Sequence, residues 1–153
     1  MDAVLCVLLA VISYTDIKRR QIPDWCCMCI AALAVISGAV FFDISVMERL
    51  AGAMCISVPM YGVALAVPGS FGGGDIKLMC AAGALLGVKR ILWAGITGIL
   101  CAGVYALYLL VIKNTGRKAE FPLGPFLCLG IAVNVLWRSP YWQAVILSNV
   151  WRN

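Results

Sequence analysis

Apolar runs of membrane-spanning length, separated by short charged or glycine-containing segments, make up most of this chain. Hydrophobic residues occupy 63% of its 153 positions and charged residues only 12%. A soluble domain of this size has nothing to cover so much hydrocarbon surface, so we predict an all-α, polytopic membrane protein with one domain over residues 1–153. A span needs roughly 17–25 residues. The runs predict about six transmembrane helices: 1–14, 25–42, 47–67, 76–88, 91–112 and 121–137.

The first and fourth predicted spans are short for a bilayer, and each has an aspartate at one end. Asp16 follows the first span and Asp75 precedes the fourth. A short span places its end in a thinned or water-accessible region, which a carboxylate needs. The stretch 141–151 has tryptophans near both ends and is predicted to lie at the membrane interface.

Basic residues predict the orientation of the chain in the membrane. Alternating sides from an outside N-terminus puts seven lysines and arginines on one face and five on the other, and the richer face is predicted to be cytoplasmic. The same alternation places Asp16, Asp24, Asp75 and Glu120 on the cytoplasmic face. The net charge of +5 is explained by this orientation, since the basic residues form no continuous face for nucleic acid.

The missing residue types exclude several kinds of chemistry. No histidine is present, so Ser-His triads and histidine-ligated zinc are excluded. Most of the eight cysteines lie singly within apolar segments and are predicted to pack as small hydrophobic residues. Cys26, Cys27 and Cys29 cluster but lack a second pair at zinc-site spacing, so no metal site is predicted.

The run Gly72-Gly73-Gly74-Asp75 is the strongest candidate for a functional site. Glycines permit positive φ and close approach of another chain, and Asp75 falls where the N-terminal dipole of the fourth helix favours an anion. If Asp16 lies nearby, the two carboxylates would share one proton and activate water, as in an aspartic protease. The alternative is an ordinary turn in which Asp75 caps the helix and Asp16 pairs with neighbouring basic residues.

Three motifs together resemble a known family, the type IV prepilin peptidases, which are GxGD intramembrane aspartyl proteases. The motifs are Asp-Ile-Lys-Arg-Arg-Gln-Ile-Pro-Asp at 16–24, Phe-Gly-Gly-Gly-Asp-Ile-Lys-Leu at 71–78 and Phe-Pro-Leu-Gly-Pro-Phe-Leu at 121–127. The resemblance implies a six-helix core in which Asp16 and Asp75 are the catalytic pair. It also implies cleavage of the short basic leader of prepilins or pseudopilins at the cytoplasmic face of the cell membrane, with no cofactor.

The chain departs from the larger members of that family, which also methylate the new N-terminus. Their additional region with two Cys-x-x-Cys pairs has no counterpart between the first two predicted spans, which only about ten residues separate. The chain is therefore more similar to the short peptidases of Flp or Tad pili or of archaeal preflagellins, and methylation is not expected. Leu123 stands where the family often has phenylalanine, a change expected to be tolerated.

The interpretation is an aspartic endopeptidase with Asp16 and Asp75 as general acid and base. Gly72 and Gly74 are predicted to admit the substrate backbone, and Lys18 and Lys77 to anchor an acidic group of the substrate. One alternative is a small transporter in which the aspartates bind a cation or relay protons. Another is a thiol oxidoreductase built on the clustered cysteines.

Overall fold

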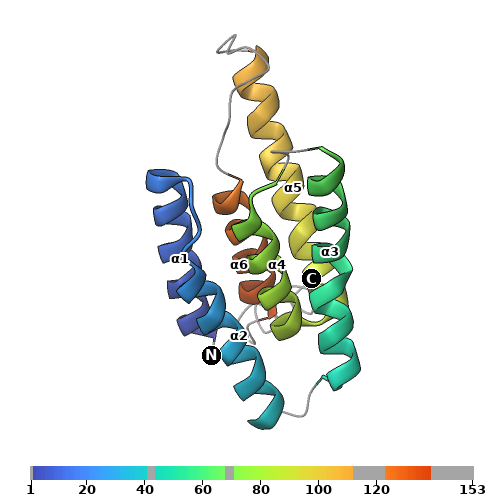
Figure 1. Cartoon of the computed structure of the whole chain (residues 1–153). Coiled ribbons are helices and arrows are strands. Elements are labelled where there is room, and N and C mark those ends of the chain that lie inside the picture. The colour runs from blue at the N-terminus through green and yellow to red at the C-terminus, as the bar shows by residue number, and fades with distance from the viewer. Residues whose placement is uncertain (1, 41–43, 68–70, 112–122, 139–153) are drawn as a thin grey trace, which may run out of the picture.

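The computed structural model describes residues 2–40, 44–67, 71–111 and 123–138, and all regular secondary structure within these ranges is helical. Figure 1 shows the helices side by side in one bundle. This confirms the predicted all-α fold with six helices. Their bounds are α1 Asp2–Arg19, α2 Asp24–Val40, α3 Val46–Ala66, α4 Gly73–Leu86, α5 Val88–Val111 and α6 Gly124–Arg138.

Helix α4 lies in the middle of the bundle, packed against α2, α3, α5 and α6, while α1 packs mainly against α6. More than half of the residues of α4 are buried, and the buried residues lie between Asp75 and Leu86. The exposed large hydrophobic side chains of the described residues all lie outside α4. An apolar outer surface around a small buried core is what a bundle in lipid requires, because lipid tails solvate apolar side chains.

Two described helices are long and apolar enough to cross a membrane, Val46–Ala66 and Val88–Leu109. Two more, Asp24–Ala39 and Gly124–Leu136, are apolar but shorter. Of the six predicted membrane spans, those outside the two long helices therefore remain predictions. The predicted interfacial stretch 141–151 and Glu120 lie outside the described residues.

Close crossings between helices depend on small residues, because a methyl group at the crossing point would enter the neighbouring backbone. A Cβ on Gly83 of α4 would collide with the carbonyl oxygen of Gly52 on α3, and a Cβ on Gly98 of α5 would lie 3.0 Å from the carbonyl oxygen of Phe126 on α6. By contrast, nothing lies within 4 Å of a Cβ placed on Gly103 of α5.

The turn between α4 and α5 consists of one residue, Gly87, with φ of 78°. Residues that carry a side chain rarely adopt a positive φ of this size, which glycine reaches at no steric cost. The Gly87 N–H donates to the carbonyl of Gly83 at 2.9 Å, which closes the last turn of α4. The chain can therefore reverse direction immediately and run α5 back along the bundle.

Arg49, in the first turn of α3, ties three helices together at the end of the bundle where α4 finishes. Its Nη1 donates to the carbonyl of Ala34 at 3.0 Å and to the Ser37 hydroxyl at 2.8 Å, both on α2. The same nitrogen lies 3.4 Å from the carbonyl of Ala84 near the end of α4. The last turn of α4 leaves carbonyls without intrahelical partners, and a guanidinium satisfies such groups.

Candidate active site

Asp16 lies in the last turn of α1, and its side chain is only 6% exposed. Its Oδ2 accepts a hydrogen bond from the backbone N–H of Gly124 at 3.1 Å. Gly124 is the first residue of α6, where helical N–H groups have no intrahelical acceptor. The start of α6 thus supplies a donor and a favourable dipole that orient the Asp16 carboxylate.

Asp75 lies in the first turn of α4, as the sequence predicted, and is 8% exposed. The N-cap residue of this helix is Gly72, and Asp75, the third residue of the helix, accepts a backbone hydrogen bond from it, so the helix-capping role of the alternative interpretation is not contradicted. Among the described residues, no group donates to the buried Oδ1 of Asp75. A buried carboxylate oxygen without a partner is costly unless it holds a proton or meets a ligand.

Of the three glycines before Asp75, Gly74 acts through close packing with another segment, and the positive φ expected for the glycines is wrong. Gly72 has φ of −71°, and Gly73 and Gly74 already belong to α4, so the helix begins before the predicted 76. A Cβ on Gly74 would lie 2.8 Å from the Cβ of Ile22, in the segment joining α1 to α2. The lack of a side chain at Gly74 therefore lets this segment lie directly against the start of α4.

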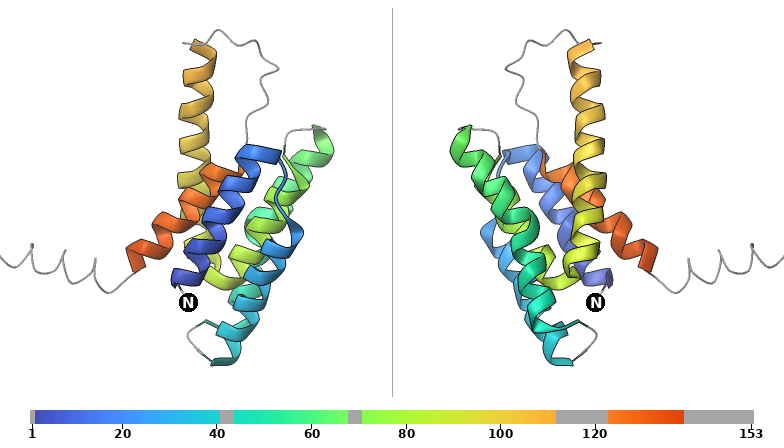
Figure 2. Two further views of the ribbon diagram at one scale, coloured as in Figure 1. Left: turned by 90° about the vertical axis from the view of Figure 1, so that its left-hand side faces the viewer. Right: turned by 90° about the vertical axis from the view of Figure 1, so that its right-hand side faces the viewer.

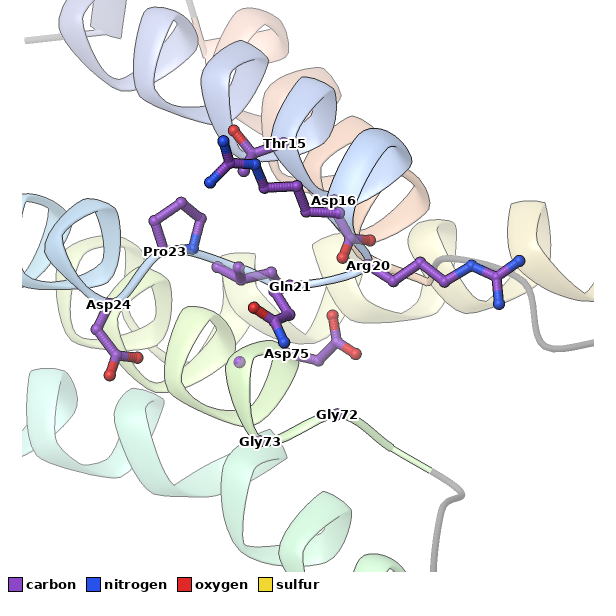
Figure 3. A pocket seen from close by; sticks show the side chains of 12 residues that line it. Thr15, Asp16, Arg20, Gln21, Pro23, Asp24, Gly72, Gly73 and Asp75 are labelled. Carbon is purple, nitrogen blue, oxygen red and sulfur yellow. The ribbon is translucent and has the colours of Figure 1, made fainter.

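The two aspartates face one cavity of about 480 Å³. In Figure 3 their side chains point into the same space, with Gln21 beside them. The walls come from the end of α1, the segment joining α1 to α2, and the start of α4. The lining residues are Thr15, Asp16, Arg19, Arg20, Gln21, Ile22, Pro23, Asp24, Gly72, Gly73, Gly74 and Asp75. Two of the three motifs noted in the sequence thus meet here.

Burial changes the protonation of both carboxyl groups, which lie just outside the apolar runs 1–14 and 76–88. Desolvation is the main cause that raises the pKa of Asp75 to about 6, and the negative charge of Asp16 adds to it, while a backbone hydrogen bond from Gly72 opposes it. Burial also raises the pKa of Asp16, and the bond from Gly124 opposes that rise. The pair therefore retains one proton up to about pH 6, above the range in which free carboxyl groups titrate.

Lys18 and Lys77 do not line this cavity. The Lys77 ammonium forms an exposed ion pair with Asp24, with 2.8 Å between Nζ and Oδ1. The Lys18 ammonium lies over the ring of Tyr14, 5.8 Å from its centre. The proposed role of the two lysines in holding the substrate remains a prediction, and in the structure both are engaged within the chain.

The clustered cysteines do not present a thiol pair at one surface. Cys26 and Cys27 are buried in the core, Cys29 is exposed, and all three are free. A reactive thiol must be accessible to its partner. The arrangement therefore does not favour the thiol oxidoreductase alternative.

Sequence reasoning did not single out Gly124 and Ile22 as parts of the site. Gly124 lies 108 positions from the aspartate that it holds, and Ile22 reaches the site only because the α1–α2 connection is short. A glycine followed by proline at the start of a predicted helix was the available signal for Gly124, because this position presents free N–H groups.

Comparison with known proteins places this geometry in context. Residues 3–107 match the model of the Type IV leader peptidase family. The match includes both aspartates and the glycines before Asp75, and it ends before Gly124. It covers well over half of the chain.

Curated relatives agree with this match. A protein of Bacillus subtilis (strain 168), named prepilin leader peptidase/N-methyltransferase, is 26% identical over 134 residues, which are 85% of this chain and 52% of that protein. A protein of the same name from Xanthomonas campestris is 27% identical over 139 residues, covering 88% of this chain and 48% of its own length. The chain thus spans about half the length of the curated relatives it matches. No solved structure gives a significant match.

Proposed function

The chain belongs to the Type IV leader peptidase family, and from this premise we propose that it is a membrane aspartic endopeptidase. Its substrates are prepilin-like or pseudopilin proteins, which it cleaves between a short basic leader and the following apolar helix. The reaction takes place at the cytoplasmic face of the cell membrane. The observation that carries the proposal is that Asp16 and Asp75, far apart in the sequence, are both buried and line one cavity.

Asp75 is the better candidate for the proton-bearing carboxyl group. Its Oδ1 has no partner among the described residues, and its pKa is raised to about 6. Asp16 receives the Gly124 N–H, which stabilises its ionised form. In the substrate complex, the Asp16 carboxylate accepts a proton from water as the water oxygen attacks the scissile carbonyl carbon, and Asp75 donates its proton to the carbonyl oxygen.

Collapse of the tetrahedral intermediate breaks the C–N bond. The proton that Asp16 took from water passes to the leaving amine, and Asp75 regains a proton from the hydroxyl of the intermediate. The carboxyl groups thus return to their starting state, and no metal or organic group is needed to balance the atoms. Transferase chemistry forms no part of this proposal, and an unmethylated product remains a prediction.

The test uses a prepilin probe, a peptide with a short basic leader, a glycine and an apolar segment of about 20 residues. Asp16→Asn and Asp75→Asn should each lower cleavage of the probe by at least about a thousandfold in detergent, with normal protein levels. Asp24→Asn is the matched control, because Asp24 lies at the same cavity but is exposed and paired with Lys77. Its loss should be much smaller.

Cleavage at the wild-type rate by either of the first two variants would remove that residue from the catalytic role. The transporter alternative makes a different prediction. It requires both aspartates for proton or cation flux into vesicles that contain the purified protein, with no cleavage of the probe by the wild-type protein.

A further inference from the structure

A second cavity, of about 670 Å³, lies between α2, α3 and α4 beside the site. Met28 and Ala31 of α2, Ala53 and Ser57 of α3, and Cys80 and Ala84 of α4 line it. We call it the α2–α3–α4 groove. Helix α4 packs against both α2 and α3, and the three helices can be followed in Figure 1 and in the two views of Figure 2.

Small residues at helical spacing form two walls of the groove. Ala53 and Ser57 are four positions apart on α3, as are Cys80 and Ala84 on α4, so each pair lies on one helix face. Small side chains at this spacing let another helix approach closely in a membrane, where packing drives association. The shape of the groove therefore suits a helix.

Ser57 distinguishes a peptide from a lipid as the occupant. It is 8% exposed, and its hydroxyl has no hydrogen-bond partner within the described part of the chain. By contrast, Ser37 and Thr97 each donate to a carbonyl of their own helix. A buried hydroxyl without a partner has lost its hydrogen bonds to water and gained none in the protein, which is unfavourable. A peptide backbone offers it a carbonyl acceptor, whereas an acyl chain offers none.

The groove is continuous with the carboxylate cavity. Asp24 lines both, and the Asp24–Lys77 ion pair stands where they meet. On α4 the groove begins at Ile76, the residue after Asp75, and extends to Ala84. At 1.5 Å per residue this distance is about 12 Å, or roughly eight residues of a helix. A helix in the groove would lead its N-terminal end to the two aspartates.

We infer that the α2–α3–α4 groove binds the first two turns of the apolar helix of the substrate and so presents the peptide bond before that helix to Asp16 and Asp75. The inference rests on the proposed function, since it takes the substrate class from there. It commits to a peptide helix, and lipid is the competing occupant.

Two native cysteines provide a cross-linking test. Cys80 lines the groove, and Cys101 on α5 is also exposed but does not line it. In the Asp75→Asn background, the other accessible cysteines are changed to alanine, so that either Cys80 or Cys101 remains. Each enzyme is mixed in lipid nanodiscs with prepilin probes that carry one cysteine at successive helix positions, and disulfide formation is measured by mass.

Cys80 should cross-link at least about tenfold more than Cys101, with maxima three to four residues apart along the probe helix. Equal cross-linking of the two cysteines, with wild-type cleavage of the probe intact, would mean that lipid fills the groove and would overturn the inference. Preferential cross-linking without any cleavage by the wild-type protein would support the docking site and overturn the peptidase proposal. If neither preferential cross-linking nor cleavage is observed, the docking inference and the peptidase proposal are both overturned.

A kinetic measurement on the cleaving enzyme adds an independent test. Cys80→Trp fills the groove from an exposed position and should raise KM for the prepilin probe by about tenfold or more. Cys101→Trp adds the same side chain to α5 and should leave KM unchanged. A leader peptide without the apolar segment should be cleaved equally poorly by both variants. An unchanged KM in Cys80→Trp would count against docking in the groove.

Discussion

Asp16 and Gly124 are joined by a hydrogen bond from the Gly124 N–H to Asp16 Oδ2, 3.1 Å long, across 108 positions of sequence. A Cβ placed on Gly124 would lie 2.5 Å from Oδ2 and 2.9 Å from Cγ of the same aspartate. The contact therefore requires both the free N–H at the start of α6 and the missing side chain of glycine. It links the third sequence motif to the first.

Gly124→Ala should impair cleavage by displacing the Asp16 carboxylate. The added methyl group meets the carboxylate at less than van der Waals distance, so Asp16 must rotate away from the cavity or α6 must move. We expect kcat for the prepilin probe to fall by about a hundredfold or more, with a smaller change in KM. Gly103→Ala on α5 is the control, because nothing lies within 4 Å of its Cβ. Equal activity of the two variants would mean that the start of α6 does not position Asp16.

Gly74→Ala and Gly73→Ala test the packing of the segment between α1 and α2 against α4. A Cβ at Gly74 would lie 2.8 Å from the Cβ of Ile22, whereas a Cβ at Gly73 meets nothing within 4 Å. Both positions lie in the first turn of α4, where alanine loses less backbone freedom than glycine when the helix forms. Gly74→Ala should therefore lose most of its cleavage activity, and Gly73→Ala should keep its activity and unfold at a slightly higher temperature.

If Gly74→Ala cuts the prepilin probe at the wild-type rate, the close packing of Ile22 on α4 is not needed for catalysis. Changing Ile22 to alanine in the Gly74→Ala background provides the second measurement. It removes the side chain that the new methyl group meets, so it should restore part of the lost activity.

The six helices were predictable because lipid-facing helices must be apolar along most of their length, and charges or glycines mark their ends. The placement of Asp75 in the first turn of α4 was predictable for the same reason. The conformation of Gly72 to Gly74 was not, because a glycine run is compatible with either a left-handed loop or the start of a helix. Packing against Ile22 favours the helix.

Relations between helices far apart in the sequence could not be derived from one chain. Hydropathy gives no register between α1 and α6, so the Gly124 donor to Asp16 was not predicted. In the sequence, Arg49 is only one of the five basic residues predicted on the face opposite the cytoplasm, yet it binds carbonyls of two other helices. A guanidinium near helix ends can be a surface charge or can donate to helix carbonyls, and the packing of the helices decides which role it has.

Arg49→Met should destabilise the bundle without altering the chemistry of the site. It removes the hydrogen bonds to Ala34 and Ser37 and the contact with Ala84, which join α2, α3 and α4 at the end of the bundle where α4 finishes. We expect a loss of about 2–4 kcal/mol, seen as a lower melting temperature in detergent. Arg49→Lys should recover part of the stability. An unchanged melting temperature in Arg49→Met would show that these bonds contribute nothing net.

Cleavage should decline as pH rises above about 6, because the proton that Asp75 donates is lost there.

The folded-state pKa of Asp75 lies above the ordinary value of 3.8, so the folded protein binds a proton that the unfolded chain has released. The Asp75 contribution to stability is therefore full below about 3.8 and is lost as pH rises through about 6. Melting temperatures of wild type and Asp75→Asn should then diverge between about pH 3.8 and about pH 6, with the Asn variant higher at the upper end of this range. Asp24→Asn should follow the wild-type pH profile in both measurements. Parallel melting curves for wild type and Asp75→Asn over this range would mean that Asp75 does not hold the proton.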